Sequence, residues 1–535
     1  LYLLSADRKQ VRQLCFDQDH NWNPAVMNNG RILYTRWEYM DIPHYYSRLL
    51  FHMNPDGTDQ KAYYGSNSIW PNSIFFARPI PGESRKVAAI ISGHHGVARI
   101  GELTILDSGK GQFEAEGVVQ RIPGYGKKVK AIISDSLVNS SWPKFLHPCP
   151  IDANTFIVSC QPTADSLWGV YLVDTFDNML LLKEQPGQVL VEPLAFRPTT
   201  KPPVIADKVD LTRRDATVNI SDIYIGPGLK GVPRGTVDRL RVFTLHYGYN
   251  GVGGWSSVAI EGSWEPKRII GTVPVEKDGS ASFRVPANTP IVLQPIDRQG
   301  RALQIMRSWF TAMPGENVSC IGCHEKPNSA PPVKRSLASR QEPRKLTPWY
   351  GLTRGIDFGR EIQPILNAKC IKCHDGRKKS GPNFADTKLG KGQRVMATFP
   401  HSYNQLHPFV RRPGPESDYL VAEPLEYHAS TSELIQILEK GHHDVKLSAE
   451  DWDRLVTWID MNVQAYGTWS QQPKYDQSKV DAERKLRIEL RKKYAFLDED
   501  GEVAKGAADE TANTVLSRSG EKYVPLTPPQ PRRTA

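Results

Sequence analysis

The chain contains no long apolar run. None of its 535 residues lies in a stretch approaching the roughly 18 consecutive apolar residues of a transmembrane helix, so we predict that the chain does not span a membrane. Residues 1–4 are apolar, but polar residues follow at once, without the basic start and long apolar core of a signal peptide. Because the sequence does not begin with Met, we expect that a leader has been removed or lies outside it.

Sequence signals of nucleic-acid binding are also missing. Lys and Arg (68) exceed Asp and Glu (58), which gives a formal net charge of +10. No Arg/Lys-rich helix or zinc-finger spacing accompanies this charge, so we predict no nucleic-acid partner. Two explanations of the excess stay open: a solvated basic surface, and a docking face for an acidic partner protein.

Cysteine is scarce, with only seven in the chain. Four of them form two C-x-x-C-H motifs. In such a motif two thiols on one turn add to the two vinyl groups of haem, and the adjacent His faces the iron. A four-cysteine zinc site is the alternative, but it does not explain a His directly after each pair. We predict two covalently bound c-type haems, held by Cys320, Cys323 and His324 and by Cys370, Cys373 and His374.

Three cysteines remain: Cys15, Cys149 and Cys160. Covalent haem attachment takes place outside the cytoplasm in bacteria, so we predict a periplasmic or equivalent compartment, where these thiols meet oxidising conditions. Cys149 and Cys160 flank a predicted strand at 155–159. The sequence leaves two alternatives for them, a disulfide across a hairpin or two buried free thiols.

A second axial ligand decides what each haem can do. For the second haem the best candidates are His442 and His443, which lie between two predicted helices, where small cytochromes c place a distal ligand. His428 is the reserve candidate. The alternative is that the His pair only decorates a helix C-terminus, where a cation suits the helix dipole.

For the first haem we expect His324 to be the proximal iron ligand and the distal side to be open or weakly held. Met313 lies only seven residues before Cys320, too close to wrap round to the iron. The distal candidates come from the N-terminal half: Asp41, His44, His94 and His95. A bis-His site closed by His94 or His95 is the competing prediction.

The first 215 residues show the pattern of many short strands. Segments 31–39, 86–92, 155–159 and 169–173 are rich in β-branched and aromatic residues. Turn clusters such as Asn-Pro-Asp-Gly at 54–57 separate the strands. We predict a β-propeller over 1–215, with a β-sandwich as the alternative.

Residues 216–345 are again β-rich and contain the first motif, so we predict a separate middle domain there. A hairpin is expected from 271–275 and 280–285, joined by Glu-Lys-Asp-Gly at 276–279. Residues 471–535 are polar, and we predict a basic helix over 476–497 followed by a tail of disordered composition.

Residues 346–470 have the layout of an α-helical, cytochrome c-like domain. Pro364 should limit or kink the helix that precedes Cys370. Ser430 and Ser448 each begin a capping-box pattern ahead of an apolar stripe. Gly441 is a plausible helix stop between them.

Three runs precede the first motif, and a fourth contains it. They are Gly-Pro-Gly-Leu-Lys-Gly-Val-Pro-Arg-Gly-Thr-Val at 226–237, Lys-Arg-Ile-Ile-Gly-Thr-Val-Pro-Val-Glu at 267–276, Val-Pro-Ala-Asn-Thr-Pro at 285–290 and Met-Pro-Gly-Glu-Asn-Val-Ser-Cys-Ile-Gly-Cys-His-Glu at 313–325. Together they resemble the middle domain of the hydrazine synthase alpha-subunit family. Residues 36–41 and 53–58 resemble the family's propeller, and 441–460 resemble its C-terminal cytochrome domain.

The resemblance implies a propeller, a middle domain with an unusual open haem, and a cytochrome domain with a bis-His haem. In hydrazine-forming members, ammonium and a nitric-oxide-derived species combine at the open haem, and the second haem delivers electrons. A tyrosine four residues after the motif His binds the iron there, which frees that His for zinc. Here Asn328 stands at that position, so zinc remains without support. Asp41 belongs to the run that resembles the distal-side segment, which implies a catalytic role for it.

The leading hypothesis is an extracytoplasmic dihaem cytochrome with a redox partner protein, in a hetero- or homo-oligomer. It would act in electron transfer, or as a redox enzyme on a small nitrogen or oxygen compound at the first haem. One alternative is a hydrazine synthase alpha subunit. The other is a docking or structural protein, in which the propeller binds a partner and the haems only relay electrons.

Overall fold

The structure is a computed structural model that describes residues 1–17, 20–38, 40–42, 48–94, 99–132, 134–254, 256–260, 262, 264–325, 329–330, 335–378, 381–391, 397–414, 420–504 and 527. Within these ranges the chain forms two compact units. Unit 1 comprises residues 1–39 and 43–209, and unit 2 comprises residues 40–42 and 210–534. The segments predicted at 216–345 and 346–470 both lie in unit 2.

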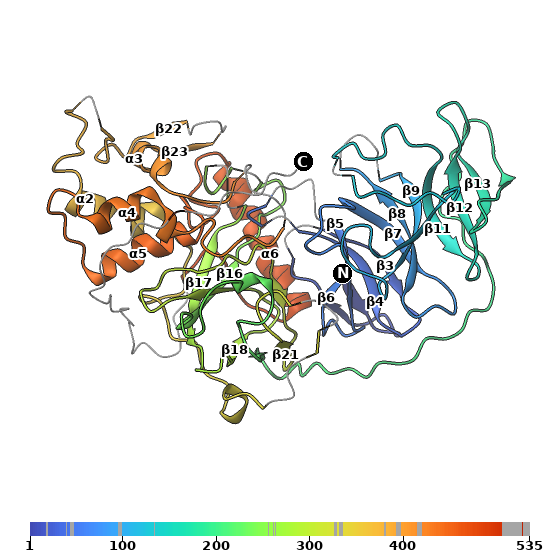
Figure 1. The fold of residues 1–535 in the computed structure, drawn as a ribbon, viewed down its shortest axis with the longest axis horizontal. Helices are drawn as coiled ribbons and strands as arrows, with labels where there is room; N and C mark the ends of the chain where they lie inside the picture. Colours follow the sequence, from blue (N-terminus) through green and yellow to red (C-terminus); the bar gives the residue numbers. More distant parts are fainter. Residues whose placement is uncertain are drawn as a thin grey trace. The chain divides into compact units, whose positions relative to one another are not determined.

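Unit 1 consists of strands that pair mostly in antiparallel fashion (Figure 1). A hairpin of β1 and β2 is followed by three four-stranded meanders, β3–β6, β7–β10 and β11–β14. A single parallel pair between β5 and β7 joins the first two meanders into one sheet. The strands are β1 (Tyr2–Leu4), β2 (Val11–Gln13), β3 (Asn21–Val26), β4 (Ile32–Trp37), β5 (Arg48–Met53), β6 (Lys61–Tyr64), β7 (Ser73–Pro79), β8 (Lys86–Ser92), β9 (Glu102–Asp107), β10 (Val118–Ile122), β11 (Lys144–Pro150), β12 (Thr155–Gln161), β13 (Gly169–Asp174) and β14 (Met179–Lys183).

The meanders pack on one another through apolar side chains. Along β8, Val87, Ala89 and Ile91 belong to the core shared with the first meander. Ala88 and Ile90 belong to the core shared with the third. Because successive side chains of a strand point to opposite faces, β8 is buried on both faces. This double burial explains why the sequence there is a continuous apolar run.

The strand predictions for unit 1 are confirmed at 86–92, 155–159 and 169–173, which become β8, β12 and β13. The disulfide alternative is wrong, because both Cys149 and Cys160 are free. β11 and β12 pair so that Cys149 lies opposite Ile157 and Phe145 lies opposite Cys160. The two cysteines are therefore not cross-strand partners, and the Cys160 thiol is buried in the core between the second and third meanders.

The β-rich part of unit 2 contains two sheets. In one, β15 lies between antiparallel β18 and parallel β21. The other has the order β17-β16-β19-β20. The elements are β15 (Asp215–Ile220), η1 (Pro227–Leu229), β16 (Arg239–Leu245), β17 (Lys267–Pro274), β18 (Ala281–Pro286), β19 (Pro290–Ile296), β20 (Phe310–Thr311), β21 (Asn317–Cys320) and η2 (Ala338–Arg340).

The hairpin predicted in this region is wrong. The turn at 276–279 does form, because Gly279 N donates to the carbonyl of Glu276 over 2.8 Å. However, β17 pairs with β16 and β18 pairs with β15. The two strands therefore enter different sheets, and the turn is a corner between them.

Residues 346–470 contain little β-structure, but they are less helical than we predicted. Its helices are short, and long irregular segments join them, because prolines interrupt the chain at 364, 382, 400, 408 and 413. The elements are α1 (Phe358–Glu361), α2 (Gln363–Lys369), β22 (Leu389–Lys391), β23 (Thr398–Pro400), α3 (His401–Leu406), η3 (His407–Phe409), η4 (Ala429–Thr431), α4 (Glu433–Lys440) and α5 (Ala449–Asp460).

The predicted helix boundaries are confirmed in part. Pro364 stands in the first turn of α2 and separates it from α1. Ser448 caps α5 in a capping box with Asp451. Ser430 does not cap α4, because that helix starts two residues later with Ser432 at its N-cap and Ser430 lies in η4.

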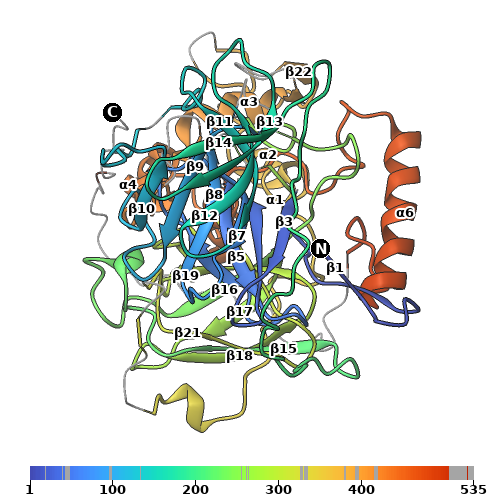
Figure 2. The same ribbon diagram turned by 90° about the vertical axis from the view of Figure 1, so that its right-hand side faces the viewer.

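A basic helix, α6 (Gln477–Ala495), forms as predicted and runs unbroken (Figure 2). Asp476 caps it by accepting a hydrogen bond from Ser478 N over 2.8 Å. The helix ends where Phe496 turns left-handed, at φ 57°. The predicted disordered tail lies outside the described residues, apart from residues before 505 and residue 527. In the part of the chain that the structure describes, no helix is both long and apolar enough to cross a membrane.

Candidate haem-binding sites

The first C-x-x-C-H motif starts at the end of β21. Cys320 is the last residue of this strand and lies opposite Ile220 of β15. Cys320 and Cys323 both pack against the apolar cluster built from β15, β16 and β18. Burial raises the pKa of each thiol to about 12. Both sulfurs therefore stay protonated at neutral pH and lie in apolar surroundings, which suit the edge of a porphyrin.

Two glycines make room for this motif. A Cβ on Gly228 would lie 2.4 Å from Cys323 Sγ, and a Cβ on Gly226, whose φ is +98°, would lie 2.5 Å from the Cys323 carbonyl oxygen. Gly228 N also donates to that oxygen over 3.2 Å. A larger residue at Gly228 would displace the thiol, and one at Gly226 would displace the backbone of the motif. The Gly-Pro-Gly run at 226–228 is thus part of the site.

Glu325 closes the motif loop, because its carboxylate accepts hydrogen bonds from Ile321 N (3.0 Å) and Gly322 N (3.4 Å). His324 beside it has left-handed backbone geometry, with φ +62°. Burial lowers the pKa of the His324 imidazole, so the ring is neutral at pH 7, as a metal ligand must be. Asn328 lies outside the described residues.

The second motif continues α2 by one turn. Cys370 N donates to Leu366 O over 2.8 Å, and His374 N donates to Cys370 O over 3.0 Å. This turn places the two thiols one helical turn apart, as attachment to two vinyl groups requires. Cys370 packs against the core of unit 2, whereas Cys373 is exposed.

His442 stands across from His374. Their ring centres are 6.0 Å apart, and their planes are inclined by only 16°. Two imidazoles on opposite sides of one iron have ring centres about 6 Å apart, because each metal–nitrogen bond is about 2 Å long and each ring centre lies about 1 Å beyond the nitrogen. The residues of the second motif therefore fit a bis-His haem, and the geometry favours His442. His443 is exposed, and its ring is turned by 75° from that of His442.

The surroundings of His374 hold its ring in place. Phe384 N donates to His374 O over 2.8 Å, and the Phe384 ring lies 5.2 Å from the imidazole. A Cβ on Gly381 would lie 3.8 Å from His374 Nδ1. The loop after the motif thus folds back over the motif histidine.

Asp41 lies in unit 2, in a buried ion pair with Lys267. Asn462 Nδ2 donates to its other oxygen over 2.8 Å, and Lys267 Nζ also donates to Met461 O over 3.2 Å. The carboxylate is thus engaged by two partners, at the start of β17 and the end of α5. Its predicted catalytic role at the first haem stays a prediction.

The N-terminal histidines are placed only in part. His94 lies in unit 1, where its Nε2 is 3.4 Å from Arg48 Nη2 and its ring packs against Trp37 at 5.7 Å. His44 and His95 lie outside the described residues. Met313 is fully buried in the core of unit 2. Among the described residues, no group of three or more His, Cys, Asp or Glu side chains could hold a metal ion.

His428, the reserve ligand, lies in the interior of unit 2. It is fully buried, and neither ring nitrogen has a hydrogen-bond partner. Its backbone is fixed, because Ser432 Oγ donates to its carbonyl over 3.0 Å. Gln304, whose carbonyl lies near the ring, donates to Gly228 O over 2.6 Å, so His428 belongs to the layer that packs on the first motif. Sequence reasoning had no signal for this burial.

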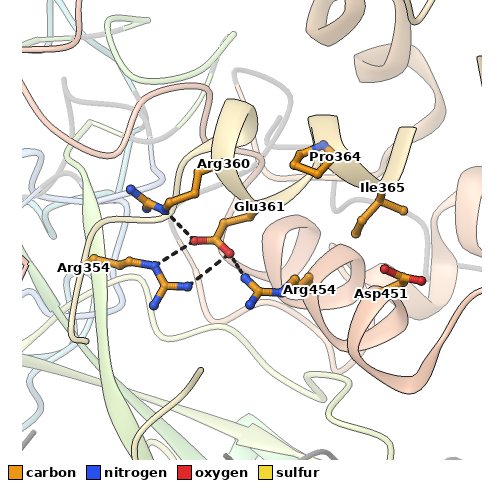
Figure 3. Close-up of a pocket in the computed structure, with 7 residues that line it drawn as sticks. All are labelled: Arg354, Arg360, Glu361, Pro364, Ile365, Asp451 and Arg454. Atoms are coloured by element: carbon orange, nitrogen blue, oxygen red, sulfur yellow. Dashed lines mark hydrogen bonds and ion pairs between the residues drawn. The ribbon is translucent and has the colours of Figure 1, made fainter. Parts of the chain in front are cut away.

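A cavity of about 460 Å³ lies beside α2 (Figure 3). The Glu361 side chain is fully buried. It forms ion pairs with the guanidinium groups of Arg354 (2.9 Å), Arg360 (2.9 Å) and Arg454. Arg354 also donates to Tyr350 O, and Arg454 pairs with Glu450. The guanidinium groups are therefore used within the protein. The cluster clamps α1 to α5 and is a structural feature.

One comparison with known proteins matches the region of the first motif. Residues 235–325 match the family described as the hydrazine synthase alpha subunit middle domain. The match runs from just before β16 to Glu325, so it contains Cys320, Cys323 and His324.

Hydrazine synthase subunit alpha of Kuenenia stuttgartiensis is 24% identical, over 46% of this chain and 41% of that protein. This chain thus matches less than half the length of its curated relative. A solved structure of Kuenenia stuttgartiensis hydrazine synthase has the same fold, with a TM-score of 0.65 and 17% identity over 86% of this chain and 71% of that chain. The resemblance in the sequence is confirmed, and the chain is a hydrazine synthase alpha-like protein.

Proposed function

We propose that the chain is an extracytoplasmic dihaem c-type cytochrome. Cys320, Cys323 and His324 hold the first haem, where electron transfer or a reaction of a small nitrogen or oxygen compound takes place. Cys370, Cys373, His374 and His442 hold the second haem, which relays electrons. A bound haem supplies one-electron chemistry at its iron and, where an axial position is open, a binding place for a small ligand.

The observation that carries this proposal is the His374–His442 pair, with parallel rings at 6.0 Å directly beside Cys370 and Cys373. These two histidines are 68 positions apart in the sequence, so no local structure brings them together. Two imidazoles held at this spacing match bis-His ligation. Strong ligands on both sides of an iron favour electron transfer over substrate binding.

The first site supports a different role. The described residues of the motif offer the imidazole of His324 and the thiols of Cys320 and Cys323, which pack against one apolar cluster. We propose an open or weakly held distal side, with Asp41 as a catalytic candidate. The stacked antiparallel meanders of unit 1 support a β-propeller, and the relation to hydrazine synthase supports an oligomer in the periplasm.

Counting and titrating the haems tests this proposal. A pyridine haemochrome assay on weighed, denatured protein should return about two haems per chain, because thioether bonds survive denaturation. Nitric oxide or carbon monoxide added to the reduced protein should then bind at one haem of two. Binding at neither haem would leave only a relay or docking protein, and a haem count near one would remove one motif from the proposal.

A second candidate function is hydrazine synthesis from nitric oxide and ammonium. The match of residues 235–325 to the hydrazine synthase alpha middle domain favours it. The protein, given nitric oxide, ammonium and an excess of a chemical reductant, should then release hydrazine and water, because forming the N–N bond from these two compounds takes up three electrons. A colorimetric aldehyde assay detects the hydrazine. Gas binding at the first haem without hydrazine release would support the broader redox function instead.

A further inference from the structure

The second motif lies at the surface of unit 2. Cys373 is exposed, and His374 and His442 are each half-buried. A haem attached there would have an edge open to solvent. Electrons pass between proteins most readily at such an edge, so the charges around it bear on the choice of partner.

Exposed cationic side chains are frequent in the motif loop and in two segments that the fold brings to it. The fold adds two segments to the motif loop. Residues 385–391, which end in β22, follow Phe384, whose ring lies 5.2 Å from that of His374, and residues 440–448, which join α4 to α5, contain His442, whose ring faces His374 at 6.0 Å. We call the exposed cations of these three segments the basic rim. Its members are Lys372, Arg377, Lys378, Lys388, Lys391, Lys440 and Lys446.

The carboxylates of the same segments do not cancel the positive charge of the basic rim. They are Asp375, Asp386 and Asp444. Asp375 pairs with Arg377 Nε at 3.1 Å, and Asp386 pairs with His401 Nδ1 at 2.8 Å. Seven cations thus face three carboxylates, two of which are already paired, and the two propionates of a bound haem leave the sum positive.

We propose that the basic rim is the docking surface of an acidic electron-transfer protein that exchanges electrons at the second motif. The proposal rests on the proposed function, because it needs a haem at Cys370–His374. The step breaks and forms no covalent bond: one electron leaves the reduced centre of the partner, and the ferric iron at this motif gains it.

The chemistry of the surface fits this kind of partner. Exposed lysines attract an acidic surface from a distance and raise the association rate, while they contribute little to the lifetime of the complex. Fast association with fast release suits a protein that must deliver single electrons repeatedly. The same cations, screened by salt, should lose this effect within a Debye length of about 10 Å at 0.1 M ionic strength.

Two small oxidants of opposite charge test the sign of the rim. The reduced full-length protein is mixed in a stopped-flow instrument with hexacyanoferrate(III) or with tris(phenanthroline)cobalt(III). Oxidation of the second haem by the anion should slow at least about threefold between roughly 10 mM and 300 mM ionic strength, and oxidation by the cation should speed up. Equal or reversed salt dependence for the two reagents would overturn the proposal.

Charge-reversed variants locate the effect. Lys372→Glu with Lys378→Glu should lower the low-salt rate with the anion several-fold and flatten its salt dependence. The matched control, Lys485→Glu with Lys493→Glu, changes exposed lysines of α6 by the same charge and should leave both slopes unchanged. If the control behaves like the rim variant, the effect comes from net charge, and the rim is not the docking surface.

An acidic protein donor completes the test. Reduced plant-type [2Fe–2S] ferredoxin, used as the probe, should reduce the second haem faster at low than at high ionic strength, and the rim variant should lose that difference. No salt dependence would contradict the docking role. A haem count near one, with motif two empty, would instead show that the proposed function itself has failed, so the two failures are distinguishable.

Discussion

Arg241 on β16 donates a hydrogen bond to Thr457 Oγ1 on α5 over 2.8 Å. The Arg241 side chain is buried and also donates to Gln294 Oε1 (2.5 Å) and to Gly300 O (2.9 Å). One guanidinium thus joins the sheet that contains β16 to α5. Gln294 adds a second link, because its amide donates to Asp460 O over 2.8 Å. These hydrogen bonds link the β-rich part of unit 2 to α5.

Replacing Arg241 should weaken this connection. Arg241→Met keeps the length of the side chain but leaves three buried acceptors without a donor, so we expect a loss of about 3 kcal/mol in the free energy of unfolding. Urea unfolding followed by tryptophan fluorescence measures it. Arg298→Met is the matched control, because the Arg298 side chain is 84% exposed, and it should change stability by less than about 0.5 kcal/mol. Equal effects of the two changes would contradict the role of the buried network.

His428 should make unit 2 sensitive to acid. Burial lowers the pKa of His428 from 6.5 to about 4. Between pH 6.5 and pH 4 the His428 ring is therefore protonated in the unfolded chain and neutral in the folded chain. Stability therefore rises with pH in this window and is lost as the pH falls from about 6.5 to about 4, by on the order of 3 kcal/mol. Unfolding in urea at pH 7 and pH 4.5 checks this.

The control for that experiment is His428→Leu. It removes two buried nitrogens without partners and the titration together, so its loss of stability on acidification should be smaller than that of the natural chain. Asp460, whose pKa burial raises to about 7, binds a proton in the folded state as the pH falls and so opposes this loss of stability. It is present in both proteins, so its contribution cancels in the comparison. Identical pH dependence in the two proteins would show that His428 does not titrate as described.

His442 and His443 should behave differently on replacement. His442→Ala should turn the second haem from low-spin to high-spin, because one of its two strong ligands is lost. His443→Ala should leave the low-spin signal intact, since that ring is exposed and turned away from the pair. Electron paramagnetic resonance of the ferric protein separates these outcomes. A high-spin signal in His443→Ala alone would reverse our choice of ligand.

Gly228 should be required for haem attachment at the first motif. Gly228→Ala would place a Cβ 2.4 Å from Cys323 Sγ, closer than any ordinary contact, so the thiol must move. We expect the haem count to fall from about two to about one per chain, as measured by pyridine haemochrome. Gly359→Ala is the control, because its Cβ would meet only the Asp357 carboxylate at 3.2 Å. An unchanged count in Gly228→Ala would show that the loop gives way.

Some elements were predictable because their causes are local. Ser448 and Asp451 form their capping box within four residues, and Pro364 interrupts its helix at its own position. The strand at 86–92 was readable because burial on both faces leaves a continuous apolar run. Where a partner lies far away, the same reasoning fails. The turn at 276–279 was visible, but the partners of its two flanking strands, β16 and β15, are set by long-range packing.

The sequence by itself predicted haem attachment, because Cys-x-x-Cys-His brings its thiols and imidazole together within five residues. It also determined the relationship, since the runs before Cys320 are local and specific. Only the tertiary structure placed His442 opposite His374, paired Asp41 with Lys267, and buried His428 without a partner. Each of these depends on which distant surfaces exclude water together. That is a property of the packed chain, and no short stretch of sequence contains it.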